Sequence, residues 1–203
     1  MEQPLHTTAA PRAAGLSDEA LAAQACRGDD YAFAQLVRRY EAPLYRYACR
    51  MLGNAAEAED VFQETFLRVH QHLSHYRHGS LFQPWLYNIA TNQCIDRLRR
   101  RKRRFFLSLD AAEPGERPLG ERLEGNAPAP DALAQAHETA ERIEAAIARL
   151  PLKHRTVFLM ARYEQMSYDD IARALGVPTG TVKSRMNKAT AAILAAMDRA
   201  STP

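Results

Sequence analysis

The sequence predicts an all-α fold of two small helical domains joined by a flexible linker. On both sides of a central break, apolar residues recur with the i, i+3, i+4, i+7 spacing of amphipathic helices. The break itself is rich in Pro, Gly and acidic residues, which interrupt regular structure. No alternating strand pattern of useful length occurs, and 203 residues suffice for one ordinary domain or two small ones.

The domain boundaries follow from these shifts in composition. Residues 1–16 lack periodicity and predict a disordered N-terminal tail, and residues 17–104 predict a four-helix bundle. Residues 105–132 carry many Pro and Gly residues and more acids than bases, which is typical of a flexible acidic linker. Residues 133–199 return to the helical spacing and predict the second domain.

Four periodic segments supply the helices of the first domain. Ser17 precedes two acids, which the positive end of a helix favours. An apolar stripe from Phe33 to Met51 predicts the second helix, which ends at the turn signal Gly53-Asn54. The third helix covers about 55–75. The fourth runs from about 81 to 104 and ends in seven basic residues among the last eight.

The clearest motif lies in the second domain, from Ser167 to Lys188. A short helix, a turn containing Gly176 and a second helix make a helix-turn-helix pattern. The second helix would present free backbone N–H groups, hydroxyls and cations to an anionic groove. The candidate DNA-binding side chains are Thr179, Thr181, Lys183, Ser184 and Arg185. A plain helical hairpin with a solvated basic face is the alternative.

The basic run at residues 97–104 favours phosphate neutralisation, although a solvated charge run is the alternative. Upstream aromatic residues, among them Trp85, suit unstacked bases. At this helical spacing, however, Trp85 is more often a core residue. The third helix carries acids on its solvent side, which indicates either an ordinary amphipathic helix or a docking surface for a basic partner.

The remaining features narrow the class of protein. Cys26, Cys49 and Cys94 are odd in number and far apart, so we expect reduced packing thiols, with a redox sensor as the alternative. No segment has the apolar length of a signal peptide or membrane span, which favours a cytoplasmic protein without membrane insertion. No catalytic motif, metal site or cofactor site is expected, and His70, His72, His75 and His78 fit a surface cluster.

Two regions resemble the extracytoplasmic-function (ECF) sigma factors of the sigma-70 family. The first is AEDVFQETFL at 58–67, followed by F-x-x-W-L-Y-x-I-A-x-N at 82–92. The second is L-P-x-x-x-R-x-V-F at 150–158, followed by S-Y-D-D-I-A-x-x-L-G-V-P-x-G-T-V-K-S-R at 167–185. The resemblance covers residues 17–104 and 135–197. It implies a sigma-2-like bundle and a sigma-4-like helix-turn-helix domain.

The resemblance also implies functional roles. A sigma factor binds core RNA polymerase, at the largest-subunit clamp and the flap, and directs promoter-specific initiation. The residues matching the docking motif are Asp60, Gln63 and Glu64. Those on the −10-reading and melting helix are Trp85, Asn92, Arg97, Arg100, Arg101 and Arg104. Lys183, Ser184, Arg185, Asn187 and Lys188 fall on the −35 recognition helix. Gln165 stands where a glycine is common in the family. The promoter sequence cannot be predicted from these residues.

Small sigma factors of this kind are commonly held inactive by an anti-sigma factor, so we expect such a partner beside polymerase and promoter DNA. The main rival is a stand-alone helix-turn-helix transcription regulator, which has no need of the acidic docking helix. A nucleic-acid enzyme is a second rival, but no catalytic motif supports it.

Overall fold

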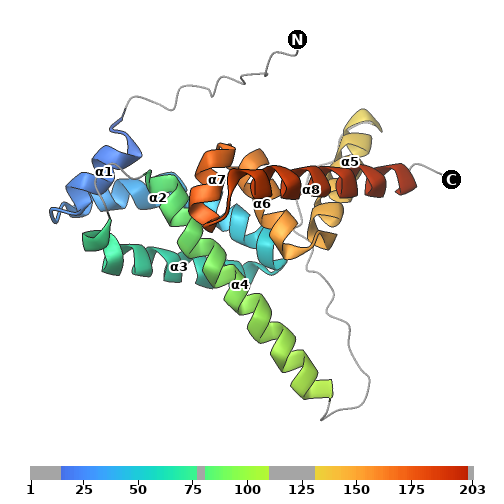
Figure 1. Ribbon diagram of the computed structural model, residues 1–203, viewed down its shortest axis with the longest axis horizontal. Coiled ribbons are helices and arrows are strands. Elements are labelled where there is room, and N and C mark those ends of the chain that lie inside the picture. Colours follow the sequence, from blue (N-terminus) through green and yellow to red (C-terminus); the bar gives the residue numbers. More distant parts are fainter. Residues whose placement is uncertain (1–14, 77–80, 110–130, 201–203) are drawn as a thin grey trace.

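The computed structural model describes residues 15–76, 81–109 and 131–200. Within these ranges the chain forms eight α-helices and one short 3-10 helix, with no strand, so the all-α prediction is confirmed (Figure 1). The first domain consists of α1 (Asp18–Ala25), α2 (Asp30–Leu52), α3 (Ala55–His72), the 3-10 helix η1 (Leu73–His75) and α4 (Phe82–Leu109). The second consists of α5 (Asp131–Arg149), α6 (Leu152–Arg162), α7 (Tyr168–Leu175) and α8 (Thr179–Ala200).

Capping side chains set the start of each early helix. The Ser17 hydroxyl accepts from the Ala20 amide at 3.2 Å, and the Asn54 side chain accepts from the Glu57 amide at 2.8 Å. These bonds satisfy amides that have no partner within the helix. Gly53 ends α2 with a φ of +67°, a left-handed conformation that glycine adopts without a steric penalty.

A cluster of aromatic rings holds α2 and α4 together at the centre of the first domain. Tyr40, Tyr47, Phe82 and Tyr87 are fully buried, and the Tyr47 and Tyr87 ring centroids lie 5.1 Å apart in an edge-to-face arrangement. The Tyr47 hydroxyl is satisfied by Thr91 at an oxygen–oxygen distance of 2.7 Å. This packing fixes the N-terminal half of α4, where the candidate base-reading residues lie.

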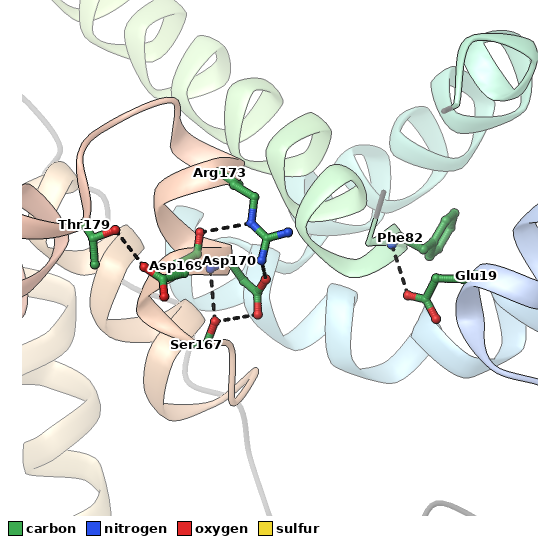
Figure 2. Close-up of polar contacts among 7 residues, drawn as sticks. All are labelled: Glu19, Phe82, Ser167, Asp169, Asp170, Arg173 and Thr179. Carbon is green, nitrogen blue, oxygen red and sulfur yellow. Dashed lines mark hydrogen bonds and ion pairs between the residues drawn. The ribbon is translucent and has the colours of Figure 1, made fainter. Parts of the chain in front are cut away.

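The second domain contributes its own buried side chains to the core, among them Ile147, Leu159, Ile171 and Val182. The Ser167 hydroxyl accepts from the Asp170 amide at 3.1 Å and donates to the Asp170 carboxylate at 2.6 Å, which fixes the start of α7 (Figure 2). Gly176 ends α7 with a φ of +64°, and α8 begins at Thr179. The predicted helix-turn-helix is therefore present.

Both helices that border the predicted linker extend further than expected. α4 continues to Leu109, past the expected boundary at 104, and α5 begins at Asp131, two residues before the domain boundary drawn at 133. Arg and Lys are good helix formers, so the basic run prolongs α4, whose C-terminal half projects from the body of the protein (Figure 1). Residues 110–130, most of the predicted linker, and residues 1–14 of the predicted tail lie outside the described residues.

The two domains pack against each other. α7 lies on α4, and α5 and α6 lie against α2 (Figure 1). At the end of α2, the Arg50 guanidinium lies 2.9 Å from the Glu144 carboxylate and 3.9 Å from the centroid of the Tyr163 ring. The Arg155 guanidinium donates to the Met51 carbonyl oxygen at 3.0 Å. The segments joined by the predicted linker thus form one packed body.

The turn between α6 and α7 contains an unusual backbone conformation. Gln165 has a φ of +54°, the only positive φ of a non-glycine residue in the described part of the chain. A side chain at this φ brings Cβ too close to the following carbonyl oxygen. Glycine adopts this conformation without that steric penalty.

Candidate nucleic-acid and polymerase interface

The outer face of α8 carries the predicted −35-reading residues. Val182, Met186 and Ala189 are buried and anchor the helix. The side chains opposite them are exposed or half-exposed, namely Thr181, Lys183, Ser184, Arg185, Asn187 and Lys188. α8 therefore presents a polar, positively charged face at the N-terminal half of the helix, where backbone amides also point outward.

Thr179 differs from the other predicted residues of α8. Its hydroxyl donates to the Asp169 carboxylate at 2.8 Å and thereby ties the start of α8 to the first turn of α7 (Figure 2). The Arg173 side chain donates to the Asp170 carboxylate at 2.6 Å in the same group. The Thr179 hydroxyl thus holds the geometry of the turn, a role that the residue type alone did not indicate.

A second positive group lies beside the outer face of α8. Burial, followed by the charges of Lys153, Lys188 and Arg185, lowers the pKa of His154. α6 packs against α8, and Lys153 in the first turn of α6 is exposed. Lys153 was not among the predicted residues, although a lysine in the first turn of the helix that follows Pro151 was a usable signal.

Trp85 and Asn92, two of the candidate −10 residues, lie on one side of α4. Trp85 is half-buried, with its ring centroid 5.2 Å from that of Tyr76 and 5.9 Å from that of Phe82. Asn92, two turns further along α4, is exposed, and its amide donates to the Asn88 side chain at 3.3 Å. One part of the Trp85 ring therefore packs on the core, as expected of a core residue, and the rest remains accessible, as a contact with an unstacked base would require.

The basic run of α4 lies next to the acidic helix α3. Arg97 is paired with Asp60 at 3.0 Å, and Arg101 lies 3.6 Å from Glu57 and donates to the Leu52 carbonyl oxygen at 3.2 Å. Arg100 is exposed, while the side chain of Arg104 lies outside the described part of the structure. Arg97 and Arg101, two of the predicted DNA-binding arginines, therefore contact α2 and α3 within the first domain.

The predicted docking residues share the solvent side of α3. Asp60 and Gln63 are exposed and Glu64 is half-exposed, paired with Arg68 at 2.7 Å within the same helix. Leu67, one turn beyond Gln63, is 59% exposed. An exposed leucine among acidic residues suits a contact surface. Leu67 was not among the predicted docking residues, although its helical spacing from Gln63 and Glu64 places it on the same face of α3.

A groove lies between α6, α7 and α8. It has a volume of about 410 Å³ and is lined by Arg162, Tyr168, Met186, Asn187, Thr190, Ala191 and Leu194. Leu194 is 58% exposed. The groove therefore offers an apolar strip along α8, towards the C-terminal side of its cationic residues.

The three cysteines are free and pack in or against the core. Cys94 is fully buried, and its burial raises the pKa of the thiol to about 12. None of the described helices combines the length and the apolar character needed to cross a bilayer. The described residues also bring together no group of three His, Cys, Asp or Glu side chains that could hold a metal ion.

Two family models match the chain, one for each domain. The model of sigma-70 region 2 matches residues 36–104, and a model of sigma-70 region 4 matches residues 140–193. ECF RNA polymerase sigma factor SigW of Bacillus subtilis is 34% identical, over 81% of this chain and 88% of the relative. ECF RNA polymerase sigma factor SigM of Mycobacterium tuberculosis is 37% identical, over 86% of this chain and 82% of the relative.

Solved structures agree with these matches. The structure of CnrH in complex with the cytosolic domain of CnrY covers 91% of this chain and 99% of its own, with a TM-score of 0.66 and 25% identity. The sigma factor RpoE of Bartonella quintana, in complex with the anti-sigma factor NepR, has the same fold, with a TM-score of 0.63 and 21% identity over 82% of this chain and 96% of its own. The chain belongs to the ECF RNA polymerase sigma factors of the sigma-70 family.

Proposed function

We propose that this ECF sigma factor divides its work among three surfaces: α3 docks on core RNA polymerase, α4 melts and reads the −10 element, and α8 reads the −35 element. The observation that carries the proposal is the outer face of α8. There Lys183, Arg185 and Lys188 stand on a helix whose other face is anchored in the core. Cations and hydroxyls in this arrangement suit phosphate and base-edge contacts in a major groove.

The −35-reading set comprises Thr181, Lys183, Ser184, Arg185, Asn187 and Lys188, with Thr179 fixing the turn that aims the helix. Lys153 at the start of α6 joins this set as a phosphate contact, because it is exposed on a helix that packs against α8. Phosphate contacts of this kind add affinity and fix register without carrying sequence information.

The −10 surface combines a half-buried aromatic ring, an exposed amide and a row of arginines. Trp85 offers a ring for an unstacked base, and Asn92 offers a donor and an acceptor for its edge. Arg97, Arg100, Arg101 and Arg104 follow along α4 and neutralise phosphates of the melted strands. Their alignment on one helix supports a path for the DNA along α4.

Two surfaces are assigned to polymerase, the acidic face of α3 and the groove along α8. Asp60, Gln63 and Glu64, together with exposed Leu67, form the proposed contact with the clamp of the largest subunit. The groove lined by Tyr168, Met186 and Leu194 is the proposed contact with the flap. An acidic helix with one exposed leucine suits a basic partner that also offers an apolar pocket.

An anti-sigma factor is the proposed regulator, acting in the cytoplasm. CnrH, which this chain matches over 99% of the CnrH chain, was solved in complex with the cytosolic domain of CnrY. An inhibitor that covers α3 or the groove on α8 would remove polymerase contacts without unfolding the protein. The protein itself acts as an initiation factor and leaves the chemistry to the polymerase.

The test is co-elution of the purified chain with bacterial core RNA polymerase, followed by transcription from a library of genomic fragments. Stoichiometric co-elution with new, start-specific transcripts supports the proposal and reveals the promoter. DNA binding without co-elution would overturn the docking assignment and favour a stand-alone helix-turn-helix regulator.

A further inference from the structure

A hydrogen bond joins the two helices of the helix-turn-helix on the side that faces solvent. The hydroxyl of Thr179, the first residue of α8, donates to the carboxylate of Asp169 in the first turn of α7 at 2.8 Å (Figure 2). Asp169 is exposed and Thr179 is half-buried. Because an exposed hydrogen bond adds little to the stability of a domain, the fold alone gives no strong reason for this contact.

The acceptor of this bond is held in place by its neighbours in α7. The Ser167 hydroxyl accepts from the Asp170 amide at 3.1 Å, and Asp170 is paired with Arg173 at 2.6 Å. The Arg173 side chain also donates to the Asp169 carbonyl oxygen at 3.4 Å (Figure 2). The first turn of α7 is therefore fixed on its own, and the start of α8 takes its position from it.

The inner sides of the two helices hold them together without fixing their angle. Ile171 and Ala172 of α7 and Val182 of α8 are buried. Burial of apolar side chains is non-directional, so these contacts tolerate a small tilt of α8. A hydrogen bond requires a defined distance and angle, and the bond from Thr179 to Asp169 therefore restrains this tilt from the outer side.

The proposed base-reading residues follow this bond directly along α8. Lys183 and Arg185 lie within two turns of Thr179. Hydrogen bonds to base edges weaken steeply when the angle or the distance changes, whereas attraction between a cation and phosphates acts over about 10 Å at 0.1 M salt. A tilt of α8 would therefore impair the reading of bases and leave most of the attraction to phosphates intact.

We propose that Asp169 is a positioning residue for −35 recognition, which accepts from Thr179 and thereby sets the angle at which α8 enters the major groove. The inference rests on the proposed role of α8. An exposed carboxylate at this position repels the phosphates of every DNA sequence alike. The contribution of Asp169 is therefore to the discrimination between −35 sequences and not to the affinity for DNA in general.

Variants of the full chain separate the hydrogen bond from the charge. Thr179→Val removes the donor and keeps the charge, whereas Asp169→Ala removes the acceptor and the charge together. Asp169→Asn removes the charge but keeps an acceptor oxygen, and Thr179→Ser keeps the donor. Glu138→Ala is the matched control, because it removes an exposed carboxylate that pairs with Arg142 inside α5.

The first readout is a ratio of two affinities, measured for each variant in complex with core RNA polymerase. One is the affinity for a promoter fragment recovered from the transcription library, and the other is that for the same fragment with a scrambled −35 element. Thr179→Val and Asp169→Ala should each lower the ratio about fivefold or more, as expected for the loss of one base contact. The double variant should lower it no further, because both changes remove the same bond.

Asp169→Asn, Thr179→Ser and Glu138→Ala should keep the parent's ratio. An unchanged ratio in Thr179→Val would overturn the positioning role. A ratio that falls as far in Asp169→Asn as in Asp169→Ala would also overturn it, because the charge and not the hydrogen bond would then set the discrimination. If the parent itself shows no preference for its own −35 element, the proposed role of α8 fails instead.

The second readout needs neither DNA nor polymerase. The Thr181 and Val182 amides donate to the Pro178 carbonyl oxygen at 2.9 and 3.3 Å, so their hydrogen exchange, followed by NMR, reports the order of the first turn of α8. Exchange should accelerate about threefold or more in Thr179→Val and Asp169→Ala, and should stay at the parent's rate in Asp169→Asn. Unchanged exchange in all variants would show that the bond does not hold the turn, and would overturn the inference while leaving the proposed function intact.

Discussion

Arg97 Nη1 lies 3.0 Å from Asp60 Oδ2, so a candidate DNA contact on α4 is paired with a candidate polymerase contact on α3. The two side chains are 31% and 62% exposed, and an ion pair screened by that much water contributes at most about 1 kcal/mol to stability. A basic partner that docks on Asp60 would compete with Arg97 for it. The pair therefore links the two surfaces without being needed for the fold.

Reversing the charge of α3 should abolish polymerase binding. In the Asp60→Lys and Glu64→Lys double variant, the acidic face of α3 becomes positive and repels a basic partner. Stability should change by about 1 kcal/mol per pair or less, since the Asp60 carboxylate is exposed and the Glu64 carboxylate is half-exposed. Binding of core polymerase, measured by biolayer interferometry, should fall at least about tenfold, equivalent to about 1.4 kcal/mol. Glu138→Lys on α5 is the control, and unchanged affinity in the double variant would refute docking through α3.

Removing two cations from α8 should weaken promoter binding without affecting docking. In the Lys183→Ala and Arg185→Ala double variant, affinity for a −35-containing fragment should fall about tenfold or more, because each base contact contributes about 1–3 kcal/mol. Where the two cations contact phosphates, the slope of log affinity against log salt should decrease by about 2. Fluorescence anisotropy across a salt series measures both. Arg142→Ala with Arg149→Ala removes two charges from exposed positions of α5 as a control, and loss of polymerase binding in the α8 variant would contradict the assignment.

The local elements were predictable because their signals are local. Ser167, Gly176 and the apolar spacing between them act over one or two turns, and they predicted the helix-turn-helix that the structure contains. The same holds for Gly53, whose left-handed conformation ends α2. The extension of α4 to Leu109 was missed, because a basic run was treated as a boundary although Arg and Lys favour helix.

Contacts between distant segments were not predictable from the sequence. Asn88 and Ala174 are 86 positions apart, and a side chain that binds a backbone carbonyl leaves no mark on the identity of its partner. The role of Thr179 was missed for a similar reason, since a hydroxyl that donates to Asp169 is indistinguishable in sequence from one that faces DNA. The residue types were informative, but the pairing depends on how the helices pack.

Cys94 should resist alkylation in the folded protein. The thiolate is the reactive form, and burial raises the pKa of this thiol from 9.0 to about 12, so very little thiolate exists at pH 8. Its reaction with iodoacetamide, followed by mass spectrometry, should be slow at pH 8 and should accelerate only at strongly alkaline pH. In urea, Cys26, Cys49 and Cys94 should react at similar rates. Labelling of Cys94 in the folded chain as fast as in urea would contradict this.

Gln165→Gly should stabilise the protein, because glycine removes the steric cost of the φ of +54°. A left-handed conformation costs a non-glycine residue about 1–2 kcal/mol, and the greater freedom of glycine in the unfolded chain offsets about 0.5–1 kcal/mol of that. The expected net gain is therefore about 1 kcal/mol or less, which for a chain of this size raises Tm by at most about 2–4 °C. Thermal unfolding followed by circular dichroism measures it.

Gln165→Ala is the matched control for that variant. Alanine keeps the Cβ atom that causes the clash, so it should give no comparable gain, and any stabilisation must come from losing the longer side chain. Equal stabilisation by glycine and alanine would show that the side chain, not the backbone conformation, carries the cost. Glu164, the residue before Gln165, contacts Gln83 and Tyr87 of α4. If Gln165→Gly raises Tm but weakens these contacts, then the strained backbone of Gln165 positions Glu164 against α4 at a cost in stability.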